Sequence, residues 1–292
     1  MTVQFRTLQL ATACAVFLCA CGGGGGGGGG SSSASLTGVF SDSAVAGLTY
    51  VIGGVAAKTD ATGHFTYSTG DTITFKVGDI VLGSASAKPF MSPVSLVSGA
   101  VDETHPTVIN ISKFLQTVDD DNNPANGIQF SNAIHAAANG RSINFAQTTG
   151  QYDGDIAVTN AYSALTGAAT SGVHVGVNDS TAQSHLRSTL FTAMAGSYSG
   201  SYSGGGSGTF TFNVDSSGAI TSGSISNTGG ATMSGNVGSG GGFASSNPGT
   251  LSGFPVTVSF NGSVAVGTST VSGTWTVIGS GYNFSGTFSG KK

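Results

Sequence analysis

The chain has 292 residues, of which 49 are glycine, and only 8% carry a formal charge, from 9 basic and 13 acidic side chains. So little charge argues against a solvated, disordered chain, and so few basic residues argue against a nucleic-acid partner. Abundant glycine with little charge favours a β-rich, turn-rich chain with one or two compact domains, as in secreted proteins.

The N-terminus has the pattern of an export signal. Residues 1–9 carry one basic side chain, Arg6, and residues 10–20 form an apolar run too short to span a bilayer. The run ends in Leu18, Cys19, Ala20 and Cys21, which resembles the lipobox of bacterial lipoproteins. The resemblance implies that residues 1–20 are a signal peptide and that Cys21 is lipidated. An ordinary secretory peptide with incidental cysteines is the alternative.

Residues 21–35 combine the lipidated cysteine with a run of glycine and serine, which is typical of a flexible tether. Gly22 stands where the lipoprotein family's inner-membrane retention signal has Asp. The resemblance therefore implies a lipid anchor in the outer membrane, with the protein facing the periplasm or the cell surface. The membrane is the expected partner through this anchor, because no apolar run approaches the length of a membrane span.

Residues 36–100 show short alternating segments separated by Gly-containing turns, which predict strands near residues 48–52, 64–67, 72–77 and 80–82. In residues 42–50 a small residue and Gly47 open a strand, and in residues 59–67 a Thr-Asp-x-x-Gly-x-aromatic turn starts the next. This pattern resembles the prealbumin-like, carboxypeptidase regulatory-like β-sandwich. The resemblance implies a scaffold or adhesion module without catalytic residues.

Residues 101–195 carry the helical patterns of the chain. Apolar residues recur at helical spacing after Pro106, at Val108, Ile111, Leu115 and Val118. Ser131 suits the cap of a short helix that ends at Asn139 and Gly140, and residues 155–165 and 180–194 are further candidates, the last capped by Asp179 or Ser180. These patterns predict a helical layer packed on the sandwich.

An acidic turn in this segment could bind a cation. Asp119, Asp121 and Asn123 place oxygen ligands at alternating positions just beyond a predicted helix end, as calcium loops do. No Glu closes a twelve-residue loop, and solvated turn carboxylates are the alternative. Calcium is therefore the one cofactor that the sequence suggests.

Residues 196–292 repeat the form Φ-Ser-Gly-x-Φ, where Φ is a large apolar residue, around four central glycines: Gly200, Gly235, Gly273 and Gly286. Alternate residues of a strand share a face, so each glycine should point inward between two large side chains. An inward glycine lets a strand coil tightly and leaves room for a neighbouring ring, as small barrels require.

Turn signals divide this segment into about eight strands, which predicts an up-and-down antiparallel β-barrel. Asn261-Gly262 lies between two apolar runs and predicts a hairpin turn. The predicted fold is therefore mainly β, with an N-terminal β-sandwich, a helical middle segment and a C-terminal barrel. Few polar groups face inward, which favours a filled barrel over one that holds a ligand.

Common enzyme motifs are missing from the sequence, and the five histidines show no ligand spacing. The interpretation is a non-catalytic, lipid-anchored envelope protein that acts as an adhesion or binding module for an unknown protein or glycan. The alternatives are a carrier that holds a small ligand or host protein in the barrel, and a structural envelope lipoprotein. An apolar cavity in the barrel would favour the carrier, and an external aromatic patch would favour adhesion.

Overall fold

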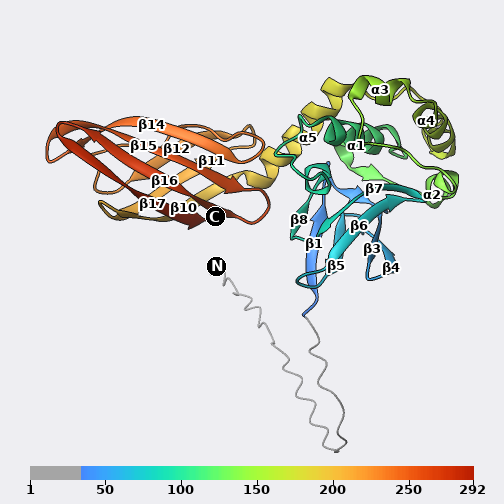
Figure 1. Ribbon diagram of the computed structural model, residues 1–292, viewed down its shortest axis with the longest axis horizontal. Helices are drawn as coiled ribbons and strands as arrows, with labels where there is room; N and C mark the ends of the chain where they lie inside the picture. Colours follow the sequence, from blue (N-terminus) through green and yellow to red (C-terminus); the bar gives the residue numbers. More distant parts are fainter. Residues whose placement is uncertain (1–33) are drawn as a thin grey trace, which may run out of the picture. The chain divides into compact units, whose positions relative to one another are not determined.

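The structure is a computed structural model that describes residues 34–292. The predicted signal peptide, Cys21 and nearly all of the tether lie outside the described residues. Within these residues the protein is mainly β with five α-helices, and it has an N-terminal region of several sheets and a C-terminal barrel of eight strands (Figure 1). Within residues 34–292, the helices fall short of the length and apolar character that a membrane span requires.

Two small sheets pack face to face in the N-terminal region. The first has the order β5-β1-β8, with β5 at His64–Tyr67, β1 at Leu36–Phe40 and β8 at Phe90–Met91. The second has the order β4-β3-β6-β7, with bounds Val55–Lys58, Thr49–Ile52, Thr72–Val77 and Ile80–Ser86. Aromatic side chains join them, because Phe75 on β6 lies 4.5 Å from Phe40 and 5.5 Å from Phe65 between ring centroids. This is the expected β-sandwich.

The predicted Thr-Asp-x-x-Gly turn forms between β4 and β5. Asp60 accepts hydrogen bonds from the backbone N–H groups of Thr62 and His64, at 2.8 and 2.9 Å. Gly63 has φ +80°, and a Cβ there would lie 2.7 Å from the Phe40 carbonyl oxygen. The turn therefore needs glycine both for its backbone angle and for close contact with β1.

Five helices follow the sandwich in the described chain. The helices are α1 (Pro106–Thr117), α2 (Asn132–Ala138), α3 (Thr149–Gly154), α4 (Ile156–Ala168) and α5 (Asp179–Met194). Strand β9 (Ile128–Gln129), between α1 and α2, pairs in parallel with β2 (Val45–Ala46), which follows β1. Two short 3-10 helices, η1 (Pro93–Leu96) and η2 (Pro124–Asn126), complete this part. Almost all of α1 is buried, although its sequence pattern predicts a single apolar stripe. The cap of α5 is Asn178, not the predicted Asp179 or Ser180, and its side chain accepts a hydrogen bond from the Thr181 N–H.

The barrel follows the predicted up-and-down order. Its strands are β10 (Gly196–Gly204), β11 (Gly208–Val214), β12 (Ala219–Ile225), β13 (Gly235–Asn236), β14 (Gly242–Leu251), β15 (Phe254–Ala265), β16 (Thr270–Gly279) and β17 (Tyr282–Lys291). All pairs are antiparallel, and β10 pairs with β17, so the first and last strands join (Figure 1). The seam lies between β13 and β14, where Val237, just after β13, forms an isolated bridge with Phe243 of β14.

The predicted hairpin at Asn261-Gly262 is wrong. Both residues lie inside β15, where Gly262 pairs with Gly273 of β16. A Cβ at Gly262 would lie 2.5 Å from the Phe288 ring, so this glycine makes room for an aromatic side chain in the core. The turn before β15 instead uses Ser252 and Gly253, which both have positive φ. Packing across the barrel thus explains the glycine that the local pattern assigns to a turn.

Candidate functional site

One end of the barrel contains an apolar cavity of about 190 Å³. Its walls come from the ends of β10, β12 and β16 and the starts of β15 and β17, chiefly Tyr202, Ile225, Val258, Trp275 and Phe284. Phe260 also lines the cavity, and rings from Phe210, Phe212, Phe243 and Phe288 fill the interior beyond it. The barrel is therefore packed along most of its length and hollow at one end.

Helix α5 covers the opposite end of the barrel. Met194, its last residue, is fully buried in the barrel core, and its carbonyl accepts a 2.6 Å hydrogen bond from the Tyr198 hydroxyl. The Lys292 ammonium group donates to the carbonyls of Ala193 and Ala195, both at 2.9 Å, where the helix ends. Cations favour a helix C-terminus, so this contact stabilises the junction.

The polar atoms around the cavity bond to the backbone. The Tyr202 hydroxyl donates to the Ser226 carbonyl at 2.7 Å, and the Trp275 indole N–H donates to the Ser203 carbonyl at 3.0 Å. A tyrosine hydroxyl is protonated at neutral pH, and burial raises the pKa of Tyr202 further, so this hydroxyl is a hydrogen-bond donor. These bonds leave mainly carbon atoms facing the cavity, which suits an apolar ligand.

The turn between β10 and β11 lies at the mouth of the cavity, where Gly205, Gly206 and Ser207 contribute to the lining. A Cβ at Gly206 would point toward Trp275 at an ordinary contact distance of 3.6 Å. On the other side of the mouth, the Asn227 amide donates to the Ser207 carbonyl at 3.0 Å. The hydrogen bond between Asn227 and Ser207 therefore joins two of the turns at the mouth.

The four repeat glycines do not share one environment. At Gly200, Gly273 and Gly286 an added Cβ would lie 2.6 to 2.8 Å from the aromatic side chains of Phe210, Phe288 and Trp275, respectively. Gly235 is exposed, has φ +127° and has no ring over it. Three of the glycines therefore make room for inward rings, and the fourth serves the backbone of short strand β13.

The acidic turn is folded around one buried carboxylate. Asp119 accepts hydrogen bonds from the N–H groups of Gln129 and Asn123, at 2.8 and 2.9 Å, and Asp121 also accepts from Asn123, at 3.0 Å. Burial, together with the neighbouring Asp121 carboxyl group, raises the pKa of Asp119 to about 6. The turn thus brings Asp119 and Asp121 together, while Asn123 contributes its backbone N–H to both.

A second polar cluster was not predicted from the sequence. His185 on α5 lies between Asp42 and Ser43, which belong to the turn after β1. Its Nδ1 is 2.8 Å from Asp42 Oδ1, and its Nε2 is 3.0 Å from Ser43 Oγ. No motif links residues about 140 positions apart, so the fold alone brings these three side chains together.

The other four histidines have structural partners. His105 caps α1 by accepting from the Thr107 N–H, and His64 bonds to Thr62 in the turn before β5. His135 bonds to Gly78 N–H and to the Gly47 carbonyl, and His174 bonds to two carbonyls. These contacts fit the sequence interpretation of scattered histidines.

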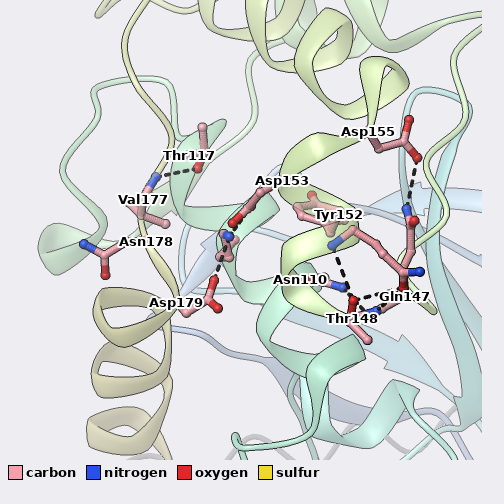
Figure 2. Close-up of polar contacts among 12 residues, drawn as sticks. Asn110, Thr117, Gln147, Thr148, Tyr152, Asp153, Asp155, Val177, Asn178 and Asp179 are labelled. Carbon is pink, nitrogen blue, oxygen red and sulfur yellow. Dashed lines mark hydrogen bonds and ion pairs between the residues drawn. The ribbon is translucent and has the colours of Figure 1, made fainter.

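The helical segment contains a buried cation. Lys113 on α1 is almost fully buried and forms ion pairs with Asp153 and Asp179, the latter at 2.7 Å. Figure 2 shows these two carboxylates directed toward each other from α3 and α5. The ammonium group also lies 5.7 Å from the centre of the Tyr152 ring. The Lys113 cluster thus links three helices, as a buried charge with partners on each side can.

In the described part of the chain, no three His, Cys, Asp or Glu side chains gather in an arrangement that could hold a metal ion. Comparison with protein-family models, with curated proteins and with solved structures gave no match to this chain. The geometry of the barrel cavity and of the polar clusters is therefore the basis for the functional proposals.

Proposed function

We propose that this protein is an exported, lipid-anchored binding protein whose C-terminal barrel takes up a small apolar ligand. The observation that carries the proposal is the cavity of about 190 Å³ at the end of the barrel, lined by Tyr202, Trp275 and aliphatic side chains. Binding sites are typically concave and mostly apolar, with a few polar groups at the edge, and this cavity has that character.

The size of the cavity limits the ligand. An apolar cavity of about 150 Å³ in another protein holds benzene, so this one suits a single aromatic ring or a short alkyl chain. A ligand that buries about six carbons gains about 5 kcal/mol at about 0.8 kcal/mol each. That free energy corresponds to a Kd of about 0.1 to 1 mM, so the proposed ligand binds weakly unless it also contacts the mouth.

Adhesion through an aromatic surface has less support. Among residues 34–292, the large apolar side chains that are strongly exposed include one aromatic residue, Phe254. An adhesive surface built on stacked rings would need several aromatic residues together. The cavity therefore favours the carrier over the adhesion module, although both are binding functions in the cell envelope.

The lipid anchor is proposed from the sequence. Leu18 to Cys21 have the form of a lipobox, and the glycine run that follows would separate the folded domains from the bilayer. More than one acyl chain on Cys21 would give stable attachment, since one chain alone binds only marginally. The proposed location is the outer membrane, with the membrane as a partner through the anchor and no nucleic-acid partner.

Trp275 allows a direct binding test because it is the only tryptophan of the chain and lines the cavity. Bromobenzene, a heavy-atom quencher of about the right size, should quench Trp275 emission along a saturable curve. Gly206→Leu should remove the saturable part, because its side chain would extend from the mouth toward Trp275.

Gly242→Leu is the matched control. An added Cβ at Gly242 meets no atom within 4 Å, and this residue is exposed at the start of β14. Bromobenzene should quench Trp275 emission of this control along the same saturable curve as in the unmodified protein. Quenching that rises linearly with bromobenzene in all three proteins would show collisions without binding, and would contradict the proposal.

A further inference from the structure

Asp42, Ser43 and His185 form an ordered chain of hydrogen bonds in the folded protein. The Asp42 side chain is fully buried, and its Oδ1 lies 2.8 Å from His185 Nδ1. The other imidazole nitrogen, Nε2, lies 3.0 Å from Ser43 Oγ. A hydroxyl, an imidazole and a carboxylate in this order are the parts of a nucleophile, its base and the group that orients the base.

The surroundings fix the direction of this chain. Gln116 on α1 donates its side-chain N–H to Asp42 Oδ2 at 3.0 Å, so Oδ1 remains directed at the imidazole. A carboxylate accepts only, so the neutral imidazole carries its proton on Nδ1 and presents the lone pair of Nε2 to Ser43. The Pro124 carbonyl lies 3.1 Å from Nε2, so it can accept a hydrogen bond from the Nε2–H group once the imidazole is protonated.

The backbone of Ser43 has an unusual conformation for a serine. Its φ is +61°, in the left-handed region that residues with a Cβ seldom adopt. The Ser43 N–H donates to Thr189 Oγ on α5 at 3.0 Å, which helps to hold this conformation. Backbone strain of this kind gathers at functional sites, and catalytic serines often lie on sharp, strained turns.

Ser43 and His185 line an open hollow of about 560 Å³. Its wall also includes Phe90, Asn126, Ser188 and Thr192, so polar and apolar groups both line it. The hydroxyl and the imidazole can thus meet a molecule from solvent, while Asp42 is buried behind them. The hollow and the barrel cavity share no lining residue, so this site is separate from the proposed binding site.

We propose that Ser43 is the nucleophile of an acyl-transfer site that hydrolyses esters of small acyl groups, with His185 as the general base and Asp42 as a positioning residue. This activity goes beyond the proposed binding function and does not depend on it.

The reaction balances with water as the only co-reactant. Ser43 Oγ bonds to the ester carbonyl carbon as its proton moves to His185 Nε2, and Asp42 stabilises the imidazolium. The bond to the leaving oxygen then breaks, and that oxygen takes the proton from Nε2 and departs as the alcohol. Water attacks the acyl carbon and gives a proton to Nε2, which returns it to Ser43 Oγ as the acid leaves.

A fluorophosphonate probe tests the proposal, because it reacts with activated serines and releases fluoride. The whole protein is incubated with the probe, digested and mapped by mass spectrometry. We expect one label per chain, on Ser43. Ser43→Ala should remove the label, and His185→Gln should slow labelling at least about 100-fold, the range of general-base catalysis. Asp42→Asn should also slow labelling, and the melting temperature of each variant shows whether it is folded.

Ser184→Ala is the matched control, since Ser184 is an exposed serine of α5 outside the lining of the hollow and should leave labelling unchanged. Mapping the unmodified protein keeps the test decisive even if a variant unfolds. A folded protein that takes up no probe, or that takes it up at a serine other than Ser43, overturns the proposal.

Discussion

Replacing Gly273 by Val tests whether inward glycines hold the barrel together. A Cβ at this position would lie 2.5 Å from Gly262 Cα and 2.7 Å from the Phe288 ring, and closer still to the Asn261 carbonyl oxygen. Ordinary contacts start near 3.4 Å, so these neighbours would have to move by almost 1 Å. Gly262 Cα and the Asn261 carbonyl oxygen belong to the backbone of β15, which is hydrogen-bonded to β14 on one side and to β16 on the other.

Overpacking a core costs about 1 to 3 kcal/mol of stability. Because the atoms in the way at Gly273 include backbone atoms, we expect Gly273→Val to destabilise the protein by about 3 kcal/mol. At about 2 to 4 °C per kcal/mol for a folded region of this size, the melting temperature should fall by about 6 to 12 °C. Urea unfolding followed by Trp275 emission measures the loss, because Trp275 lies two residues away on the same strand.

Ser272→Val is the matched control. Ser272 neighbours Gly273 but is exposed on the outer face of β16, where a surface change usually stays within about 0.5 kcal/mol. Equal losses from the two variants would refute the strand register and, with it, the explanation of the repeat.

Three further predictions concern the acidic turn, His185 and the anchor. If calcium binds at Asp119 and Asp121, calcium at about 100 times its Kd should add about 2.7 kcal/mol to the free energy of unfolding, and Asp119→Asn should abolish this gain. Identical melting curves in calcium and in chelator would exclude calcium binding at this turn. Burial opposes the charge on His185, but its bonds to Asp42 and Pro124 and the nearby Asp119 outweigh burial and raise its pKa above 6.5. The stabilisation by protonated His185 is therefore complete below pH 6.5 and is lost as pH rises through the folded-state pKa. His185→Gln should flatten the plot of unfolding free energy against pH in this range. Parallel plots for the variant and the unmodified protein would contradict the prediction. Cys21→Ala should release the protein from the membrane fraction or leave its signal uncleaved, and a cleaved variant that still fractionates with the membrane would exclude the lipid anchor.

Local patterns predicted the fold class well, because its elements depend on short-range periodicity. The sandwich turn at Asp60 and the start of α1 at Pro106 both follow from backbone preferences of a few residues. The hairpin predicted at Asn261-Gly262 was wrong because this dipeptide, which suits a hairpin turn, can also lie inside a strand, where Gly262 leaves room for the Phe288 ring. Propensity cannot separate these two roles without the neighbouring strand.

The candidate sites were harder to predict because they depend on contacts between distant residues. Ser43 and His185 meet only when α5 packs beside the turn after β1, and no motif marks either residue. The barrel cavity is the space left between Tyr202 and Trp275, so it depends on how side chains from several strands fill one end. A single sequence predicts that the barrel forms, but it does not fix the volume left at its end.

The most direct test of the proposed binding function is a crystal structure of the purified protein soaked in bromobenzene, with the bromine located by its anomalous scattering. The proposal predicts a bromine peak inside the barrel end, between Tyr202, Val258 and Trp275, where the cavity lies. Crystals of Gly206→Leu soaked in the same way should lack this peak. A barrel interior without bromine in the unmodified protein, in crystals that hold bromobenzene elsewhere, would contradict the account.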